Sequence, residues 1–169
     1  MAIWFETKVR YDKMQENGAV KKVNEPYLVD ALSFTEAEAR IIEEITPFIS
    51  GDFSISAVKK TKISDIFFDE TADRYYMVKV NFITLDEKSG VEKKTATFIL
   101  VQASDFQGAV DRFNEGMKGT MADYEISSVT ETPLMDVYPA DLSGSVKKKD
   151  ETESSGETEF GKAKVKITF

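Results

Sequence analysis

The chain has 169 residues, of which 41% are hydrophobic, and a formal net charge of −8, so it reads as a folded globular protein of one domain or two small fused ones. It contains neither cysteine nor histidine, which excludes a disulfide framework, a thiolate metal site and a Ser-His-Asp triad. The charged N-terminus is unlike a signal peptide, and no apolar run approaches the roughly 20 residues of a membrane span, so we expect a cytoplasmic protein.

The first elements are expected to form a hairpin and a helix. Residues 4–11 alternate apolar and polar side chains, which predicts a strand with one buried face. Asn17-Gly18 favours a hairpin turn, and a second strand is expected over 20–31. Ser33 and Glu36 form a capping box, which predicts that a helix starts here. A third strand is expected from 53 to 68, with a break near 59–62.

The same order follows a second time. Tyr76, Val78, Val80 and Phe82 predict the inward face of a strand, and 86–90 a turn. The next strand is expected over 95–103, and Asp105 is expected to cap a helix that Gly119 ends. Residues 124–138 are expected to form the last strand.

The two stretches also match residue by residue, which indicates an internal duplication. Ten identities occur at an offset of 72 and six at an offset of 71. The identical pairs are Gly18/Gly90, Lys21/Lys93, Lys22/Lys94, Leu28/Leu100, Val29/Val101, Ala31/Ala103, Phe34/Phe106, Ala37/Ala109, Arg40/Arg112, Glu43/Glu115, Asp52/Asp123, Ile55/Ile126, Ser56/Ser127, Val58/Val129, Thr61/Thr132 and Asp65/Asp136. Repeats of this kind fix the architecture of a fold.

The sequence therefore predicts an α+β protein built from a tandem ββαβ duplication with a pseudo-two-fold axis. One repeat spans 1–70 and the other 71–140, with antiparallel hairpins joined in one sheet or two related ones and both helices on the apolar side. Beyond 140 the chain is a charged low-complexity tail, in which 150–159 has no hydrophobic residue and is expected to be mobile. Residues 163–169 alternate again and are a candidate edge strand.

Several motifs resemble a family of small uncharacterised proteins of gut Bacteroidetes and their phages. They are the segments 4–9, 27–38, 118–124 and 135–138, and the resemblance covers about residues 1–140. The family is a domain of unknown function, so the resemblance supplies no activity and no site. Its gene setting implies an association with mobile elements and phage DNA metabolism.

Matched lysines give the candidate binding residues. Lys21-Lys22 and Lys93-Lys94 follow the two hairpin turns, and Lys8 and Lys79 lie on the preceding strands. Solvated strand faces often carry lysine, which also protects sheet edges. The sharper interpretation is two basic strips for a phosphate backbone, with Trp4 and Tyr75 as stacking platforms for bases. Lys59, Lys60 and Lys62 extend the first strip only.

The other matched polar residues have structural explanations. Arg40 and Glu43, like Arg112 and Glu115, are spaced for an i,i+3 surface ion pair. The Thr61/Thr132 and Asp65/Asp136 pairs suit hydrogen bonds at a turn or a strand end. The adjacent acids Asp69-Glu70 and Asp86-Glu87 suit solvated turns, since neighbouring side chains on a strand point to opposite faces.

We therefore expect a non-catalytic binding module with no cofactor and no metal, which binds single-stranded nucleic acid in phage or mobile-element replication. Two alternatives stay open. One is a protein-interaction or assembly module, favoured by the acidic composition and including a homodimer. The other is capture of a small nucleotide between the two halves.

Overall fold

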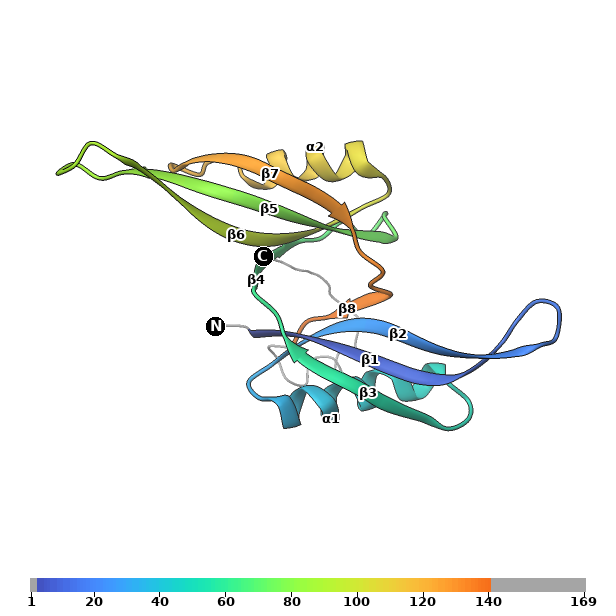
Figure 1. Cartoon of the computed structure of the whole chain (residues 1–169). Coiled ribbons are helices and arrows are strands. Elements are labelled where there is room, and N and C mark those ends of the chain that lie inside the picture. The colour runs from blue at the N-terminus through green and yellow to red at the C-terminus, as the bar shows by residue number, and fades with distance from the viewer. Residues whose placement is uncertain (1–2, 141–169) are drawn as a thin grey trace, which may run out of the picture. The chain divides into compact units, whose positions relative to one another are not determined.

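The computed structural model describes residues 3–140, and the tail and its candidate strand 163–169 lie outside the described residues. The fold is α+β, with two helices and two mixed sheets of four strands each (Figure 1). The elements run in the order β1 (Ile3–Met14), β2 (Val20–Ala31), α1 (Phe34–Ile45), a 3-10 turn (Thr46–Phe48), β3 (Phe53–Lys60), β4 (Ile63–Phe67), β5 (Arg74–Leu85), β6 (Glu92–Ala103), α2 (Phe106–Gly116), β7 (Asp123–Glu131) and β8 (Asp136–Tyr138). We call β3-β1-β2-β8 the first sheet and β4-β6-β5-β7 the second sheet.

Local signals in the sequence set most of these elements. The first hairpin turns at Gly18, whose φ of 88° is the left-handed conformation that glycine adopts without steric cost. The Ser33 Oγ accepts a hydrogen bond from the Glu36 N–H at 3.1 Å, as expected for the start of α1. The Asp105 carboxylate caps α2 in the same way, at 2.7 Å from the Gly108 N.

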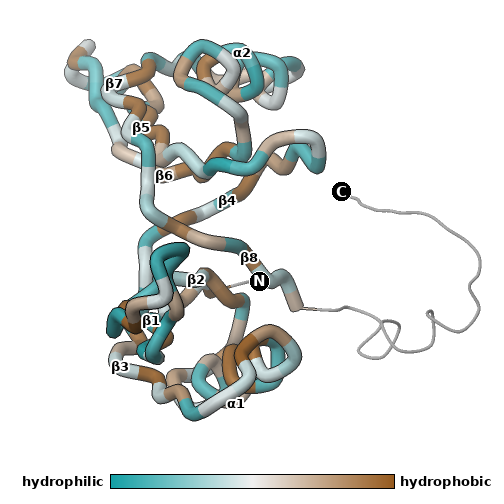
Figure 2. The backbone as a smooth tube through the Cα atoms, turned by 90° about the vertical axis from the view of Figure 1, so that its right-hand side faces the viewer, coloured by the Kyte–Doolittle hydropathy of each residue, from teal (hydrophilic) through white to brown (hydrophobic). Residues whose placement is uncertain are grey.

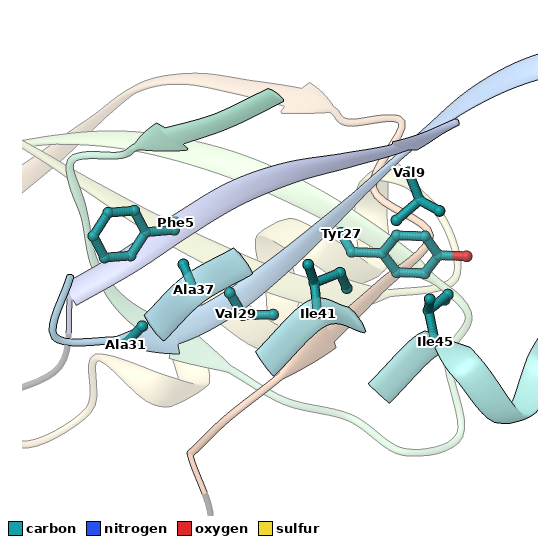
Figure 3. Packing of buried hydrophobic residues seen from close by; sticks show 8 residues of the cluster. All are labelled: Phe5, Val9, Tyr27, Val29, Ala31, Ala37, Ile41 and Ile45. Carbon is teal, nitrogen blue, oxygen red and sulfur yellow. The ribbon is translucent and has the colours of Figure 1, made fainter. Parts of the chain in front are cut away.

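Each helix covers one face of one sheet. The first core lies between α1 and the first sheet and contains Phe5, Val29 and Ile41 (Figure 3). The second lies between α2 and the second sheet, with Val78, Val101 and Phe113 fully buried. Both helices therefore pack on the apolar sides of the hairpins, as the sequence predicts.

The short strands β4 and β8 correct the prediction of one long closing strand in each half. The expected break near 59–62 is confirmed, but β4 then leaves the first sheet and pairs in parallel with β6 of the second sheet. Residues 124–138 likewise form two strands, and β8 pairs in parallel with β2 of the first sheet. Each half thus gives its last strand to the other half's sheet, which local alternation cannot reveal (Figure 2).

A third core joins the two sheets. It is a cluster of buried side chains from both, namely Trp4, Leu28, Ile63, Ile66, Tyr75, Leu100 and Val137. The hydrogen bonds on its two sides match. Thr61 Oγ1 donates to the Trp4 carbonyl at 2.8 Å, and Thr132 Oγ1 donates to the Tyr75 carbonyl at 2.8 Å. The expectation that these threonines make strand-end hydrogen bonds is confirmed.

The matched arginines hold the ends of the exchanged strands. Arg40 on α1 donates to the carbonyl of Tyr138 at 3.3 Å, and Arg112 on α2 donates to the carbonyl of Phe68 at 2.7 Å. The expected ion pair of Arg112 with Glu115 is present at 3.5 Å, whereas Arg40 pairs with Glu44 instead of Glu43, at 3.3 Å. The arginines are therefore more than surface ion-pair partners.

Candidate functional site

Three cations lie on one face of the first sheet, opposite α1; we call Lys8, Arg10 and Lys59 the basic face. Side chains alternate along β1, so Lys8 and Arg10 point away from the face that carries Val9 into the core. They are two residues apart, about 7 Å along the strand. Lys59 reaches the same face from β3, where it lies opposite Glu6 in the register. All three cations are exposed.

The neighbours of the basic face are polar, and two of them are acidic: Glu6 lies opposite Lys59, and Asp12, beyond Arg10, pairs with Lys22. Arg10 lies opposite Asn24 on β2 and Ser54 on β3. The Ser56 hydroxyl donates to the Asn24 Oδ1 at 2.8 Å, which fixes the amide next to the cations. Within residues 3–140, none of the three cations forms an ion pair. Their charges are therefore available to an external anion.

The corresponding face of the second sheet is neutralised. Lys79 lies where Lys8 does, but Asn81 stands at the place of Arg10. Glu125 on β7 forms an ion pair with Lys94 at 3.0 Å and accepts a hydrogen bond from Asn81 at 3.4 Å. Hydrogen bonds from these two residues lower the pKa of Glu125. The second of the two predicted strips is thus occupied by a carboxylate.

The lysine pairs at the hairpins do not act as units. Lys21 lies opposite Lys13 and Lys22 opposite Asp12, so the two neighbours point to opposite faces of β2. Lys22 pairs with Asp12 at 3.5 Å. Lys93 and Lys94 are divided in the same way between the two faces of β6. The structure does not bring all six predicted lysines onto one surface.

The two predicted stacking residues are in the core. Trp4 is 7% exposed and Tyr75 is 4% exposed, and both belong to the cluster that joins the sheets. The Tyr75 hydroxyl donates to the Asp136 Oδ1 at 3.2 Å. Neither ring offers a face to a base, so both are corrected from binding residues to core residues.

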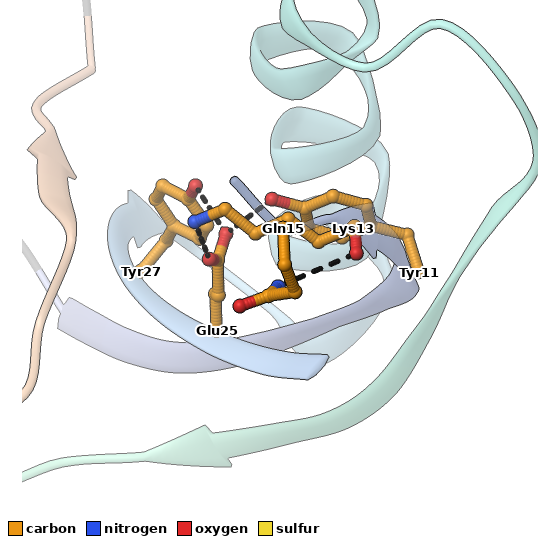
Figure 4. Close-up of polar contacts among 5 residues, drawn as sticks. All are labelled: Tyr11, Lys13, Gln15, Glu25 and Tyr27. Atoms are coloured by element: carbon orange, nitrogen blue, oxygen red, sulfur yellow. Dashed lines mark hydrogen bonds and ion pairs between the residues drawn. The ribbon is translucent and has the colours of Figure 1, made fainter. Parts of the chain in front are cut away.

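A buried carboxylate was not predicted. Glu25 on β2 is 8% exposed and accepts hydrogen bonds from Tyr11 at 2.9 Å, Lys13 at 3.1 Å and Tyr27 at 3.4 Å (Figure 4). Burial, followed by the hydrogen bond and charge of Glu25, raises the pKa of Tyr11 to about 12. The matched position in the second half is Thr97, so a comparison of the two halves would have singled out Glu25.

Arg10 could also have been found from the sequence, because it follows Lys8 by two residues and so shares its face.

The sequence matches the family described as a domain of unknown function (DUF4494) over residues 3–140. The chain belongs to this family. No curated protein and no solved structure matches it. The family assignment covers the entire described part of the chain but names no activity.

Two further properties of this DUF4494 domain concern metals and membranes. Between residues 3 and 140, no three Asp or Glu side chains are grouped so that they would hold a metal ion. Neither helix in this range is long and apolar enough to cross a membrane.

Proposed function

We propose that this DUF4494 domain is a non-catalytic module that binds single-stranded nucleic acid on its basic face. The observation that supports it is the group of three exposed cations, Lys8, Arg10 and Lys59, which have no ion-pair partner among the described residues. Cations about 7 Å apart along a strand suit the successive phosphates of an extended single strand. A local cluster of this kind attracts phosphates although the whole chain is acidic.

The proposal differs from the expectation of two strips. Only the first sheet binds, since Glu125 neutralises the second. Contacts are made to phosphates and to the neutral Asn24 and Ser56, without stacking on Trp4 or Tyr75. We therefore expect weak sequence preference, because phosphate contacts carry no base information.

Titration of a labelled oligothymidylate at several salt concentrations tests the proposal. The logarithm of the affinity should fall with the logarithm of salt by about 0.7 for each phosphate neutralised. Replacing both Lys8→Gln and Arg10→Gln should lower that slope by about 1.4. The matched control is Lys79→Gln with Lys93→Gln, which removes the same charge from the second half and should leave the slope unchanged.

Two results would reject the proposal. The first is the absence of binding at low salt. The second is an equal loss of affinity in the two double variants, which would mean that net charge rather than the basic face determines binding.

A second candidate function is assembly with another copy of the chain, and the hairpin tips favour it. Met14 lies opposite Val20 in the register, beyond the last residue that β3 pairs, and both side chains are exposed. Leu85 and Val91 are exposed at the other hairpin. Exposed apolar side chains on a projecting ribbon suit a protein contact. Sedimentation should then show a dimer that Met14→Ser with Val20→Ser dissociates, and a monomer at all concentrations would reject it.

Other parts of the interpretation stay predictions. They are descent of the two halves from one ββαβ repeat, an origin in gut Bacteroidetes or their phages, a cytoplasmic location and, as a third function, capture of a small nucleotide. Superposition of 4–68 on 75–138 tests the first of these.

A further inference from the structure

A hollow of about 250 Å³ lies at the C-terminal end of α1, beside β8. It is lined by Tyr27, Ile45, Phe48, Met135, Asp136 and Tyr138. Tyr27 and Tyr138 stack with ring centroids 6.0 Å apart and planes 21° apart. Phe48 and Met135 are 74% and 48% exposed. The hollow is thus an open site with aromatic walls.

The equivalent place in the second half is filled. Phe67, which matches Tyr138, packs so closely on the last turn of α2 that a Cβ built at Gly116 would lie 2.6 Å from its ring. Glu44 stands on α1 at the position where α2 has Gly116. The Tyr138 ring stacks on Tyr27 instead. The hollow therefore lies at a place where the two halves differ in sequence and in the packing of the matched rings.

The surroundings of the hollow are negative. Asp136 is part of its lining, and Glu44 lies close by on α1. Burial, followed by the charges of Asp136 and Glu44, raises the pKa of Tyr138 to about 12. Helix α1 ends here without a basic residue in its last turn, so its carbonyl end adds a partial negative charge. The nearby cations Lys13 and Arg40 are engaged with Glu25 and Glu44.

We propose that this hollow binds the ammonium or guanidinium group of a lysine or arginine side chain from a partner protein. Aromatic faces attract such cations through the ring quadrupole, and the Asp136 carboxylate in the lining adds Coulombic attraction, whereas Glu44 is already paired with Arg40. A volume of about 250 Å³ is below the usual range of small-molecule sites but accommodates one side chain. The exposed Phe48 and Met135 at the rim would be covered by the partner's backbone.

Nuclear magnetic resonance of the full chain, without nucleic acid, tests this proposal separately from the proposed function. The probes are the blocked amino-acid amides of lysine, arginine and norleucine, the last being the neutral analogue of lysine, together with free spermidine. We expect shifts of the Phe48 and Met135 resonances with the lysine and arginine amides only. Equal shifts with norleucine, or none with any cation at millimolar concentration, would overturn the proposal. Tighter binding of spermidine than of the lysine amide would also overturn it, since the ligand would then be a free polyamine.

A matched pair of variants completes the test. Phe48→Ala removes one aromatic wall from an exposed position and should weaken binding of the lysine amide about two- to fivefold. Phe106→Ala removes a ring that is 56% exposed at the start of α2 and should leave binding unchanged. An equal effect of the two substitutions would show that the cation does not bind in the hollow.

Discussion

The two halves of the molecule share the contacts that hold the exchanged strands β4 and β8, and they differ in their surfaces. Thr61 and Thr132 make the same hydrogen bond at the same 2.8 Å, and Arg40 and Arg112 both hold the end of the strand received from the other half. Away from these contacts the two halves differ in their surface residues. The first has a basic face, a buried Glu25 and an open hollow, whereas the second has Glu125 on the corresponding face and Phe67 packed over Gly116.

The comparison separates contacts that hold the fold from residues free to vary. A matched residue can be explained by the exchange of strands, which both halves must support. An unmatched residue has no such explanation, so it is the better candidate for function. On this criterion Glu25, Arg10 and Glu44 are better candidates for functional residues than the matched lysines that the sequence singles out.

The largest expected effect comes from substitutions in the buried cluster that joins the two sheets. Leu28 and Leu100 match in sequence and are buried in the cluster that joins the sheets. Leu28→Ala and Leu100→Ala should each lower the free energy of unfolding by about 2–5 kcal/mol. Each substitution loses the free energy gained by burying the removed methyl groups, and it leaves a cavity in the core. Urea denaturation measures this. Leu85→Ala, at an exposed hairpin tip, should cost less than about 0.5 kcal/mol. A small effect at only one of the two buried leucines would show that the two halves do not contribute equally to the stability of this cluster.

The next test concerns the last turns of the helices. Gly116→Ala should destabilise the fold by about 1–3 kcal/mol, because the new methyl group meets the Phe67 ring. Glu44→Ala at the matching position loses a half-buried i,i+4 pair with Arg40, worth about 0.5 kcal/mol, and gains helix propensity, so it should be nearly neutral. Thermal unfolding of both variants gives the comparison. If Gly116→Ala is stabilising, as for an open helix position, the second half is not filled as described.

The paired threonines should give smaller and equal effects. Thr61→Val and Thr132→Val each remove a hydroxyl that donates to a backbone carbonyl at 2.8 Å and accepts from the N–H of Ile63 or Leu134 at 3.3 Å. Each of these bonds contributes about 0.5–1.5 kcal/mol, and the shorter one contributes more. Thr35→Val on the exposed face of α1 serves as the control. Urea denaturation measures the loss in free energy of unfolding for each single variant. A loss at one threonine more than twice that at the other would contradict the equivalence of the two hydrogen bonds.

The smallest effect is a titration that depends on Glu25, which has no acidic counterpart in the second half. The pKa of Tyr11 is raised to about 12, so the folded state keeps a proton that the unfolded state loses near pH 10. This contribution to stability is complete below pH 10 and is lost as the pH rises through 12. Glu25→Gln removes two of its causes and should move the tyrosinate absorbance transition to lower pH. Glu115→Gln should not move it, and an unchanged transition in Glu25→Gln would contradict the described cluster.

The sequence predicts the local structure well. The hairpin turns, both helix caps, the break after Lys60 and the inward faces of the hairpins follow from periodicity and from the chemistry of capping residues. The α+β class follows from the same patterns. The pairing partner of each short strand does not follow from these patterns, because Ile63 and Ile66 would satisfy the alternation of either sheet.

The candidate site was predicted only in part, for the same reason. Lys8 lies on an open face as expected, but Trp4, on the same side of β1, is covered by strands from the other half. The alternation of apolar and polar residues predicts the face of the strand to which a side chain points, but it does not predict which other element packs over that face. Glu25 was missed because a single acid in a strand has no pattern, although its mismatch with Thr97 was visible.

The exchange of β4 and β8 has a consequence for the order of events during synthesis. When the first half has left the ribosome, β4 has no sheet to join, because β6 has not yet been made. The first sheet in turn waits for β8, since Tyr27 pairs with Asp136. Neither half can complete its core alone, so folding should finish only after residue 138 emerges, through contacts of long sequence separation that are slow to form. A chain divided near residue 70 should accordingly yield two fragments that are unstable apart and fold when mixed.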